Sequence, residues 1–573
     1  MTDLCPLQGI QLERYLMRGV QVNGRTVVSM AGVATLLWFL VGYILYPALK
    51  TVAVSFTDQG VFSVSHYVAL LASRSGLTAL TNSIVLGGLT VLVCGLVGTL
   101  LAFFVHYFEF PWKRVVDKLL LLPVMLPGII IVFSFVQLYG ESGLVTKTLE
   151  WGLGLDRAPY DFSGLPGILF VHAYTQYVYF YIGVSIAIRH IDASVIESAR
   201  NLGASRVKVF TSVIWPFLTP ALVTASAVTF MTGIGSFTAP MIIGGSYKVL
   251  TTQILLAKAN NFMDVAATQV VILTTISLLV FVVLRRYENK KQFHASVKGV
   301  PIQPIRVEHR GLRGVIIVAF SVLLFMVLLP VFTIVLLSFV KSGSWMVSIY
   351  PREFSFENYV AIFTKRRTLA PFLNSVVMSL TASVMCLIIA VPSSYLIEKT
   401  RSRVRGLVDI LVILPWAMPA SAIAINIINA TNVPTPFSFN KVLVGTWILL
   451  PLGYFIRSLP IMVKTTHLSF QNLNDTYIEA SKSLGASRIQ TFGRVILPML
   501  SPGLIAGFLL VFVRSVGEYT ISAFLYTASN KPVSIAMVNG IFEYNIGLAM
   551  AYGALLIMLT ATLSHVISRL TAR

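Results

Sequence analysis

Long apolar runs alternate with short polar segments along the whole chain. A transmembrane helix needs about 20 mostly apolar residues, and a helix satisfies its own backbone hydrogen bonds in lipid. The pattern therefore predicts an all-α polytopic membrane protein with about 12 transmembrane helices, six in each half. The runs are Val27–Leu49, Ile84–His106, Leu119–Val136, Leu165–Ala187, Val213–Phe237, Val265–Leu284, Val315–Phe339, Val376–Ile397, Leu407–Ile428, Val442–Ile461, Ile496–Phe524 and Ile546–Ile567.

Short motifs occur once in each half of the chain. Asn82-Ser-Ile-Val returns as Asn374-Ser-Val-Val, and a Pro-x-x-x-Pro pair ending at Pro127 returns as one ending at Pro419. Two like halves with an even number of spans share one orientation, which predicts a pseudo-twofold axis along the membrane normal. We divide the chain into a first transmembrane domain, a polar and basic cytoplasmic linker, and a second transmembrane domain, at residues 1–286, 287–312 and 313–573.

The longest repeat is a polar loop. Repeat loop 1 runs from Glu197 to Pro216 and repeat loop 2 from Glu479 to Pro498, and ten of their twenty aligned positions are identical. A single copy would suit an ordinary helical turn at the membrane surface. Two gapless copies at matching places in an apolar chain favour a contact with something outside the membrane.

Local signals predict a helix, a sharp turn and a second helix in each repeat loop. Ser194 precedes Glu197 by three residues, which is the capping-box spacing at a helix start. Gly203 is suited to end that helix, and Ser205 to cap the next one. The same positions of repeat loop 2 hold Thr476, Glu479, Gly485 and Ser487.

This spacing of Glu, Gly and hydrophobic-x-Pro resembles the EAA loop of ABC importer permeases, although Trp215 stands where Leu is usual. In that family the loop is a coupling helix that docks into a groove on the cytoplasmic ATPase. The resemblance implies coupling roles for Glu197, Ala199, Gly203, Arg206, Pro216, Glu479, Ser481, Gly485, Arg488 and Pro498.

Composition and charge fit a membrane protein. Of 573 residues, 56% are hydrophobic and 11% are charged, whereas soluble proteins have about a quarter charged. The net charge of +21 comes mostly from Lys and Arg in short loops, so it reflects topology rather than nucleic-acid binding. The excess in alternate loops predicts that both termini and both repeat loops are in the cytoplasm. The resemblance implies a multi-pass protein of the bacterial cytoplasmic (inner) membrane.

No motif for enzyme chemistry is present in the sequence. It contains no Gly-Lys dipeptide and hence no P-loop, and no H-E-x-x-H. Its cysteines, Cys5, Cys94 and Cys386, form no C-x-x-C pair, and Cys94 and Cys386 suit small buried positions. We therefore expect no catalytic site, metal or cofactor in this chain, and ATP hydrolysis by a partner.

Charged residues within the apolar runs are candidates for the translocation path. Arg514 and Glu518 are four residues apart, so on one helix they can pair, either as part of the path or as a structural ion pair. Arg457 is expected to extend towards the inner surface. We interpret the polar and aromatic group in the fourth run as packing: His172, Tyr174, Tyr177, Tyr179 and Tyr181.

The resemblance covers nearly the whole chain and implies a fused permease subunit of a type I ABC importer. It implies two copies of an ATPase subunit beneath the membrane and a periplasmic or lipid-anchored binding protein outside. The fused plan and the Gly-Glu-Tyr519 segment look most like ferric iron permeases. Permeases for thiamine or aminoethylphosphonate are alternatives, and an ion-coupled secondary transporter is an alternative of another class.

Overall fold

The computed structural model describes residues 24–58, 60–110, 112–290, 304–306, 309–345, 349–399 and 403–571. Nearly every element is a helix, and each of the four strands has two residues. The first half contains α2 (Gly24–Leu40), η1 (Val41–Leu45), α3 (Tyr46–Ser55), β1 (Thr57–Asp58), β2 (Val61–Phe62), α4 (Ser65–Ala72), α5 (Arg74–Tyr107), β3 (Phe108–Glu109), α6 (Lys113–Leu119), α7 (Leu122–Met125), α8 (Gly128–Tyr139), α9 (Leu144–Leu153), α10 (Gly164–Arg189), α11 (Ala193–Asn201), α12 (Arg206–Val209), η2 (Phe210–Ile214), α13 (Trp215–Ile234), α14 (Thr238–Ile243), α15 (Leu250–Ala259) and α16 (Met263–Lys290).

The second half repeats this plan with fewer short helices. Strands β1 and β2 form an antiparallel hairpin, and β3 pairs in parallel with β4 just before the second half begins. The elements are β4 (Ile305–Arg306), α17 (Arg310–Ser338), α18 (Glu357–Thr364), α19 (Arg366–Lys399), α20 (Arg403–Ala417), α21 (Ala420–Thr431), η3 (Pro436–Ser438), α22 (Leu449–Gln471), α23 (Asp475–Ser483), α24 (Arg488–Thr491), η4 (Phe492–Ile496), α25 (Leu497–Val516), α26 (Thr520–Leu525), α27 (Val533–Phe542) and α28 (Ile546–Thr571).

The all-α polytopic class is confirmed. In the described part of the chain, nine helical segments are long and apolar enough to span a membrane, and α20 with α21, bent by 115°, makes a tenth. The predicted run Leu119–Val136 is not one helix, because it breaks at Pro127, which caps α8. The predicted spans at α10 and α22 form helices of 26 and 23 residues, but they are not among the ten.

The two halves pack in the same way. Helices α5, α10, α13 and α16 contact one another as α19, α22, α25 and α28 do. Without a hydrophobic driving force between helices in lipid, close approach depends on small interface residues. Both long helices carry such a buried stripe: Ala79, Ser83, Gly87, Thr90, Cys94, Gly98 and Ala102 on α5, and Ser375, Ser379, Ser383, Cys386, Ala390 and Ser394 on α19.

A helix near the start of each half packs against the other half as well as against its own. Helix α3 packs on α16 and also on α21, whereas α17 packs on α28 and also on α8. One hydrogen bond joins the halves at each of these contacts. Ser134 Oγ on α8 donates to Pro330 O on α17 at 2.7 Å, and Asn429 Nδ2 on α21 donates to Thr51 Oγ1 on α3 at 3.2 Å. One large cluster of buried hydrophobic residues therefore contains side chains from both halves.

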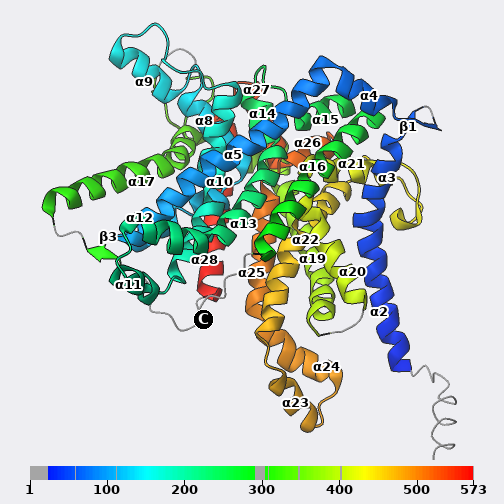
Figure 1. Ribbon diagram of the computed structural model, residues 1–573. Coiled ribbons are helices and arrows are strands. Elements are labelled where there is room, and N and C mark those ends of the chain that lie inside the picture. The colour runs from blue at the N-terminus through cyan, green and yellow to red at the C-terminus, as the bar shows by residue number, and fades with distance from the viewer. Residues whose placement is uncertain are drawn as a thin grey trace, which may run out of the picture.

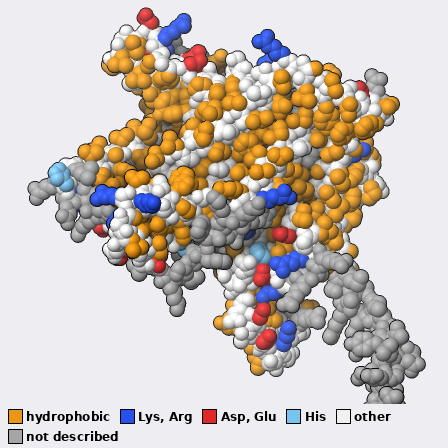
Figure 2. All heavy atoms as spheres, viewed as in Figure 1, with side chains coloured by type: hydrophobic (Ala, Val, Ile, Leu, Met, Phe, Trp, Pro, Cys, Tyr) orange, Lys and Arg blue, Asp and Glu red, His pale blue; other side chains and the backbone are white. Residues whose placement is uncertain are grey.

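Different segments of the chain make up the two polar ends of the molecule. Figure 1 places α11, α23, α24, the start of α2 and the end of α28 in the lower part, and α4, β1 and α9 in the upper part. Figure 2 shows a broad hydrophobic band, with charged side chains mostly above and below it. Both repeat loops thus lie at the same end as the described ends of the chain.

Replacing Gly98 with Ala should destabilise the α5–α10 contact. A Cβ at Gly98 would lie 2.3 Å from Tyr177 O, which is backbone and cannot yield easily, whereas a Cβ at Gly88 on the same helix meets nothing within 4 Å. We expect Gly98→Ala to lower the free energy of unfolding by about 1–3 kcal/mol, measured by detergent-induced unfolding. Gly88→Ala is the matched control and should be neutral or stabilising. Equal effects at both positions would contradict this packing.

Candidate functional site

The first helix of each repeat loop is capped by an Asx residue. The N-cap of α11 is Asp192, whose carboxylate accepts from Ser194 N at 3.0 Å, and the N-cap of α23 is Asn474, which accepts from Thr476 N at 3.0 Å. The predicted capping boxes at Ser194 and Thr476 are therefore wrong. The Asx side chains start each helix two residues earlier and take the N–H groups that a later cap would need.

The turn that ends each helix is a Schellman motif. Gly203 and Gly485 have φ of +82° and +80°, as the prediction of a glycine cap requires. Ala204 N donates to Ala199 O at 3.0 Å, and Ala486 N donates to Ser481 O at 3.1 Å. These bonds satisfy orphan carbonyls at the ends of both helices, so the turn has the same hydrogen-bond pattern in the two loops.

Each turn leads through a short helix and a π-helix into a long one. Ser205 and Ser487 cap α12 and α24 as predicted. Trp215 N donates to Phe210 O, five residues back, and Leu497 N does the same to Phe492 O. The wide π turns lie just before Pro216 and Pro498, which lack the N–H of a regular helix. Each loop is thus continuous with α13 or α25.

Hydrophobic side chains at the turns are exposed in both loops. Leu202 and Leu484 are each 88% exposed, and Ile489 and Val207 are 85% and 72% exposed. No residue of α11 or α23 is buried. Helices α23 and α24 protrude from the lower end of the molecule (Figure 1), with hydrophobic side chains at the tip (Figure 2). Exposed hydrophobic residues that are grouped together, as at these turns, are common at protein-binding surfaces.

Some of the other predicted coupling residues are exposed, and others are partly buried within the loops. The exposed ones are Glu197, Arg206, Glu479 and Pro498. Ser481 Oγ lies 3.0 Å from Thr491 Oγ1 and joins α23 to α24. Ala199 and Pro216 are half-buried, and the side chain of Arg488 lies outside the described part of the structure.

At the centre, the two halves meet through two glycine–proline contacts. A Cβ at Gly517 would lie 2.3 Å from Pro127 Cβ, and one at Gly235 would lie 3.2 Å from Pro419 Cβ. Gly235 and Gly517 stand at the same distance after the two repeat loops, at the ends of α13 and α25. In each half, the end of the helix that follows the repeat loop therefore packs against the Pro-x-x-x-Pro segment of the other half.

Two aromatic rings, one from each half, are in contact beside these glycine–proline contacts. Phe237 and Tyr519 occupy equivalent positions two residues after the glycines, and their ring centroids are 5.7 Å apart. They are 2% and 6% exposed, and Phe237 also contacts Phe524 at 5.4 Å. Sequence reasoning missed this pair. Extending the repeat alignment past the loops would have identified it, because Ser-Phe237 and Glu-Tyr519 then coincide.

The charged residues of the second half are arranged differently from the prediction. Glu518 Oε1 accepts from Arg457 Nη1 at 3.3 Å and from Ile521 N at 2.9 Å. Because α25 ends at Val516, Glu518 does not share a helix face with Arg514, and no ion pair joins them in the described structure. The expectation that Arg457 extends to the surface is also wrong, since it is held by Glu518.

Arg514 lies near charged and polar groups of both halves. It interacts electrostatically with Arg457 and Glu518, and with the hydroxyl of Tyr179 on α10 of the first half. Arg514 is itself an exposed residue. Among the described residues it makes no hydrogen bond or ion pair. The second half thus places two guanidinium groups and one carboxylate beside the central contact.

The first half is neutral at the corresponding positions. Thr232 and Ser236 stand where Arg514 and Glu518 do in the second half. Thr232 Oγ1 donates to Gln176 Oε1 at 2.7 Å, and His172 bridges Thr90 and Ser236 at 2.8 and 2.9 Å. The tyrosines of α10 are engaged similarly, with Tyr174 and Tyr177 donating to backbone carbonyls. At these positions the charge beside the central contact is therefore contributed by the second half only.

Known proteins share this plan. The sequence profile of the family described as "Binding-protein-dependent transport system inner membrane component" matches residues 95–292 and 387–573. "Probable ABC transporter permease protein y4fN" of Sinorhizobium fredii is 30% identical over 518 residues, covering 89% of this chain and 90% of that protein. "Ferric transport system permease protein FbpB" of Actinobacillus pleuropneumoniae is 24% identical over 525 residues, with coverage of 90% and 74%. "Sulfate transport system permease protein CysT" of Salmonella typhimurium is 28% identical over 183 residues, covering 31% of this chain and 65% of that protein.

The two like halves, their helical spans and the paired loops define a class, the multi-pass permease subunits of ABC importers. The chain belongs to the family of binding-protein-dependent transport system inner membrane components. The family matches twice, so two permease units are fused in one polypeptide.

Removing both partners of the Arg457–Glu518 pair should cost less stability than the sum of the losses from removing each partner alone. Glu518→Gln keeps an acceptor for Ile521 N but leaves Arg457 unpaired, and Arg457→Met leaves the carboxylate unpaired. We expect each single variant to lose about 1–3 kcal/mol, because the pair is largely buried, and the double variant to lose less than the sum.

Detergent-induced unfolding of the four proteins in this cycle measures the coupling. Glu543→Gln, a change at an exposed site, should stay within about 0.5 kcal/mol of the parent. Strictly additive losses would rule out an energetic link between Arg457 and Glu518.

Proposed function

We propose that this chain is the membrane-spanning subunit of an importer for ferric iron, powered by two copies of a separate ATPase. One ATPase subunit docks on α11 and α12, and the other on α23 and α24. A binding protein delivers the substrate at the opposite end. The observation that carries the proposal is the pair of matching Schellman turns, each presenting an 88% exposed leucine at the same end of the molecule.

The proposed mechanism uses the continuity between each repeat loop and the long helix after it. ATP draws the two ATPase subunits together, which moves the two loops. The π turns at η2 and η4 carry that displacement into α13 and α25, whose far ends are Gly235 and Gly517. Separation of these ends parts the rings of Phe237 and Tyr519 and opens the central path. ATP can drive this only because it binds the state with apposed ATPases more tightly.

Ferric iron is the proposed substrate because a relative that aligns over 90% of this chain is a ferric transport permease. The charges of Arg457 and Arg514 restrict the form in which iron can be transported. Together with one carboxylate, these two guanidinium groups repel a bare cation. Iron therefore passes these residues as a complex with anionic oxygen ligands. The same charges favour aminoethylphosphonate as the second candidate and disfavour cationic thiamine.

An ion-coupled secondary transporter is the weaker alternative. Such a carrier needs carboxylates that take up and release ions within the membrane. Glu518 is instead occupied by Arg457 and by the backbone of α26. That class also offers no role for two exposed loops with the same turn.

Charged substitutions at the two leucines should uncouple the chain from its ATPase. We expect Leu202→Glu with Leu484→Glu to weaken ATPase association at least tenfold, because a buried anchor at an interface contributes more than about 1.4 kcal/mol. Co-purification of the complex and its ATP hydrolysis measure the effect. Leu153→Glu, at a 65% exposed leucine of α9 at the other end, is the control and should leave both unchanged. An unaltered complex in the double variant would refute docking at the turns.

Uptake into proteoliposomes tests the substrate. With the binding protein, the ATPase and this chain present, we expect uptake of radiolabelled ferric iron that stops when the ATPase is catalytically dead. Arg514→Gln should lower the uptake rate at least tenfold, and Arg405→Gln, at an exposed arginine of α20, should not. Uptake of aminoethylphosphonate but not iron would replace the substrate and keep the class. Uptake of either without ATP hydrolysis would reject the class.

A further inference from the structure

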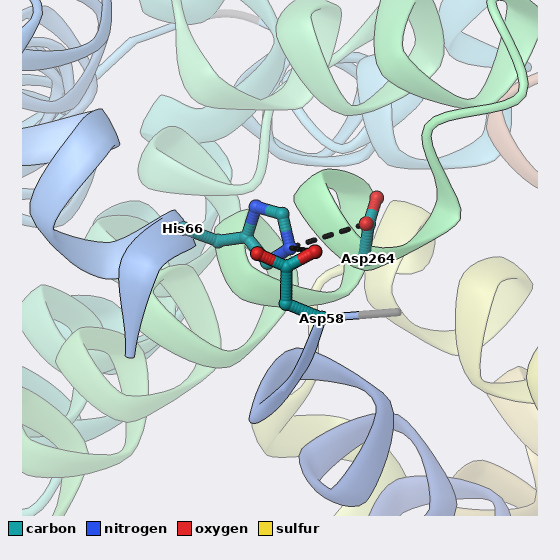
Figure 3. A group of neighbouring side chains, drawn as sticks. All are labelled: Asp58, His66 and Asp264. Carbon is teal, nitrogen blue, oxygen red and sulfur yellow. Dashed lines mark ion pairs between the residues drawn. The ribbon is translucent and has the colours of Figure 1, made fainter. Parts of the chain in front are cut away.

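A cluster of three potential metal ligands lies at the upper end of the first half, away from the repeat loops. Asp58 belongs to strand β1, His66 to the first turn of α4 and Asp264 to the first turn of α16. One ligand atom of each lies within 4.8 Å of the other two. Figure 3 shows the imidazole of His66 close to both carboxylates, which come from separate segments of the chain.

Hydrogen bonds orient both carboxylates so that one oxygen of each is left for a ligand. Asp58 Oδ2 accepts from Ser65 Oγ at 2.9 Å, and Asp264 Oδ1 accepts from Val265 N at 2.8 Å. The remaining oxygens, Asp58 Oδ1 and Asp264 Oδ2, lie 3.9 and 3.1 Å from His66 Nε2. Donors of this kind, which fix a ligand through its second oxygen, are typical of metal sites.

The imidazole nitrogen is poorly satisfied without a cation. His66 Nε2 is a buried atom and has no hydrogen bond of acceptable geometry within the described structure, even though Asp264 Oδ2 is 3.1 Å away. A buried polar atom without a partner costs free energy. Two ligands on one tetrahedral zinc ion, with bonds of about 2.0–2.2 Å, lie about 3.3 Å apart. The separation of 3.1 Å between His66 Nε2 and Asp264 Oδ2 is close to that value, and the two atoms do not have the geometry of a hydrogen bond.

We propose that Asp58, His66 and Asp264 bind a divalent transition-metal cation, with Zn²⁺ as the probe. The two carboxylates match its charge, the imidazole selects it over Mg²⁺ and Ca²⁺, and the fourth position is open to water. The cation joins the β1–β2 hairpin and α4 to the start of α16. It is thus a structural clamp on the outer end of one half, and the proposal does not depend on the transported substrate.

Among the described residues of the second half there is no equivalent cluster of potential metal ligands. Asn358 stands at the position of His66, and its Nδ2 donates to Ser338 O at 2.9 Å and Val340 O at 2.8 Å. These bonds join α18 to the end of α17 directly, without an ion. The substitution His66→Asn therefore imitates the other half of the same chain, which makes it a gentle test variant.

Zinc binding to the purified full chain, without a polyhistidine tag, tests the proposal. Calorimetry and metal analysis should find one Zn²⁺ per chain, with binding weakened at least tenfold in His66→Asn, Asp58→Asn and Asp264→Asn. His190→Asn, at an exposed histidine after α10, should bind like the parent. Zinc should also raise the melting temperature of the parent, reversibly with EDTA, and leave that of the three variants unchanged.

Two results would overturn the proposal. One is the absence of zinc from the parent at micromolar concentrations. The other is equal binding by the parent and all three variants. A simple ion pair between His66 and Asp264 predicts the first result, together with a loss of stability in His66→Asn that is the same with and without zinc. The melting curves in EDTA show whether each variant is folded, so a failure to fold is not mistaken for a lost ligand.

Discussion

The structure depends on how closely the two halves approach at their centre. Gly517 leaves no room for a Cβ beside Pro127, and Gly235 leaves little beside Pro419. This contact requires breaks in four helical segments: α13 and α25 end at the glycines, and α8 and α21 begin at the prolines. Because the breaks face one another, the rings of Phe237 and Tyr519 meet between the halves. The packing of α3 and α17 against the opposite halves then holds the halves together around this point.

The same arrangement explains how remote loops can act on the centre. Helix α25 has 20 residues and therefore spans about 30 Å. It carries an exposed loop at one end and the closing contact at the other, and α13 does the same in the first half. In the proposed mechanism, a displacement of the loops reaches the centre through these two helices. The charges of Arg457, Glu518 and Arg514 lie at one of the two far ends, so the proposed path is asymmetric.

Features encoded within one segment could be predicted from the sequence, and features made by several segments could not. The helical class, the repeat and the left-handed glycines at Gly203 and Gly485 follow from local pattern and backbone sterics. The capping boxes failed because Asp192 and Asn474, two residues earlier, compete for the same N–H groups. The partner of Glu518 was misassigned because α25 ends before it and α22 supplies Arg457. The cluster around His66 joins three segments and has no sequence signature.

Cross-linking across the centre tests the account most directly. The chain would carry Phe237→Cys and Tyr519→Cys, with Cys5, Cys94 and Cys386 replaced by Ala, and would be assembled with its ATPase in membranes. A short bifunctional reagent should join the two positions without nucleotide, since the native rings are 5.7 Å apart. The cross-link should disappear when a catalytically dead ATPase is trapped with ATP. A cross-link of equal yield in both states would contradict the claim that the loops open this contact.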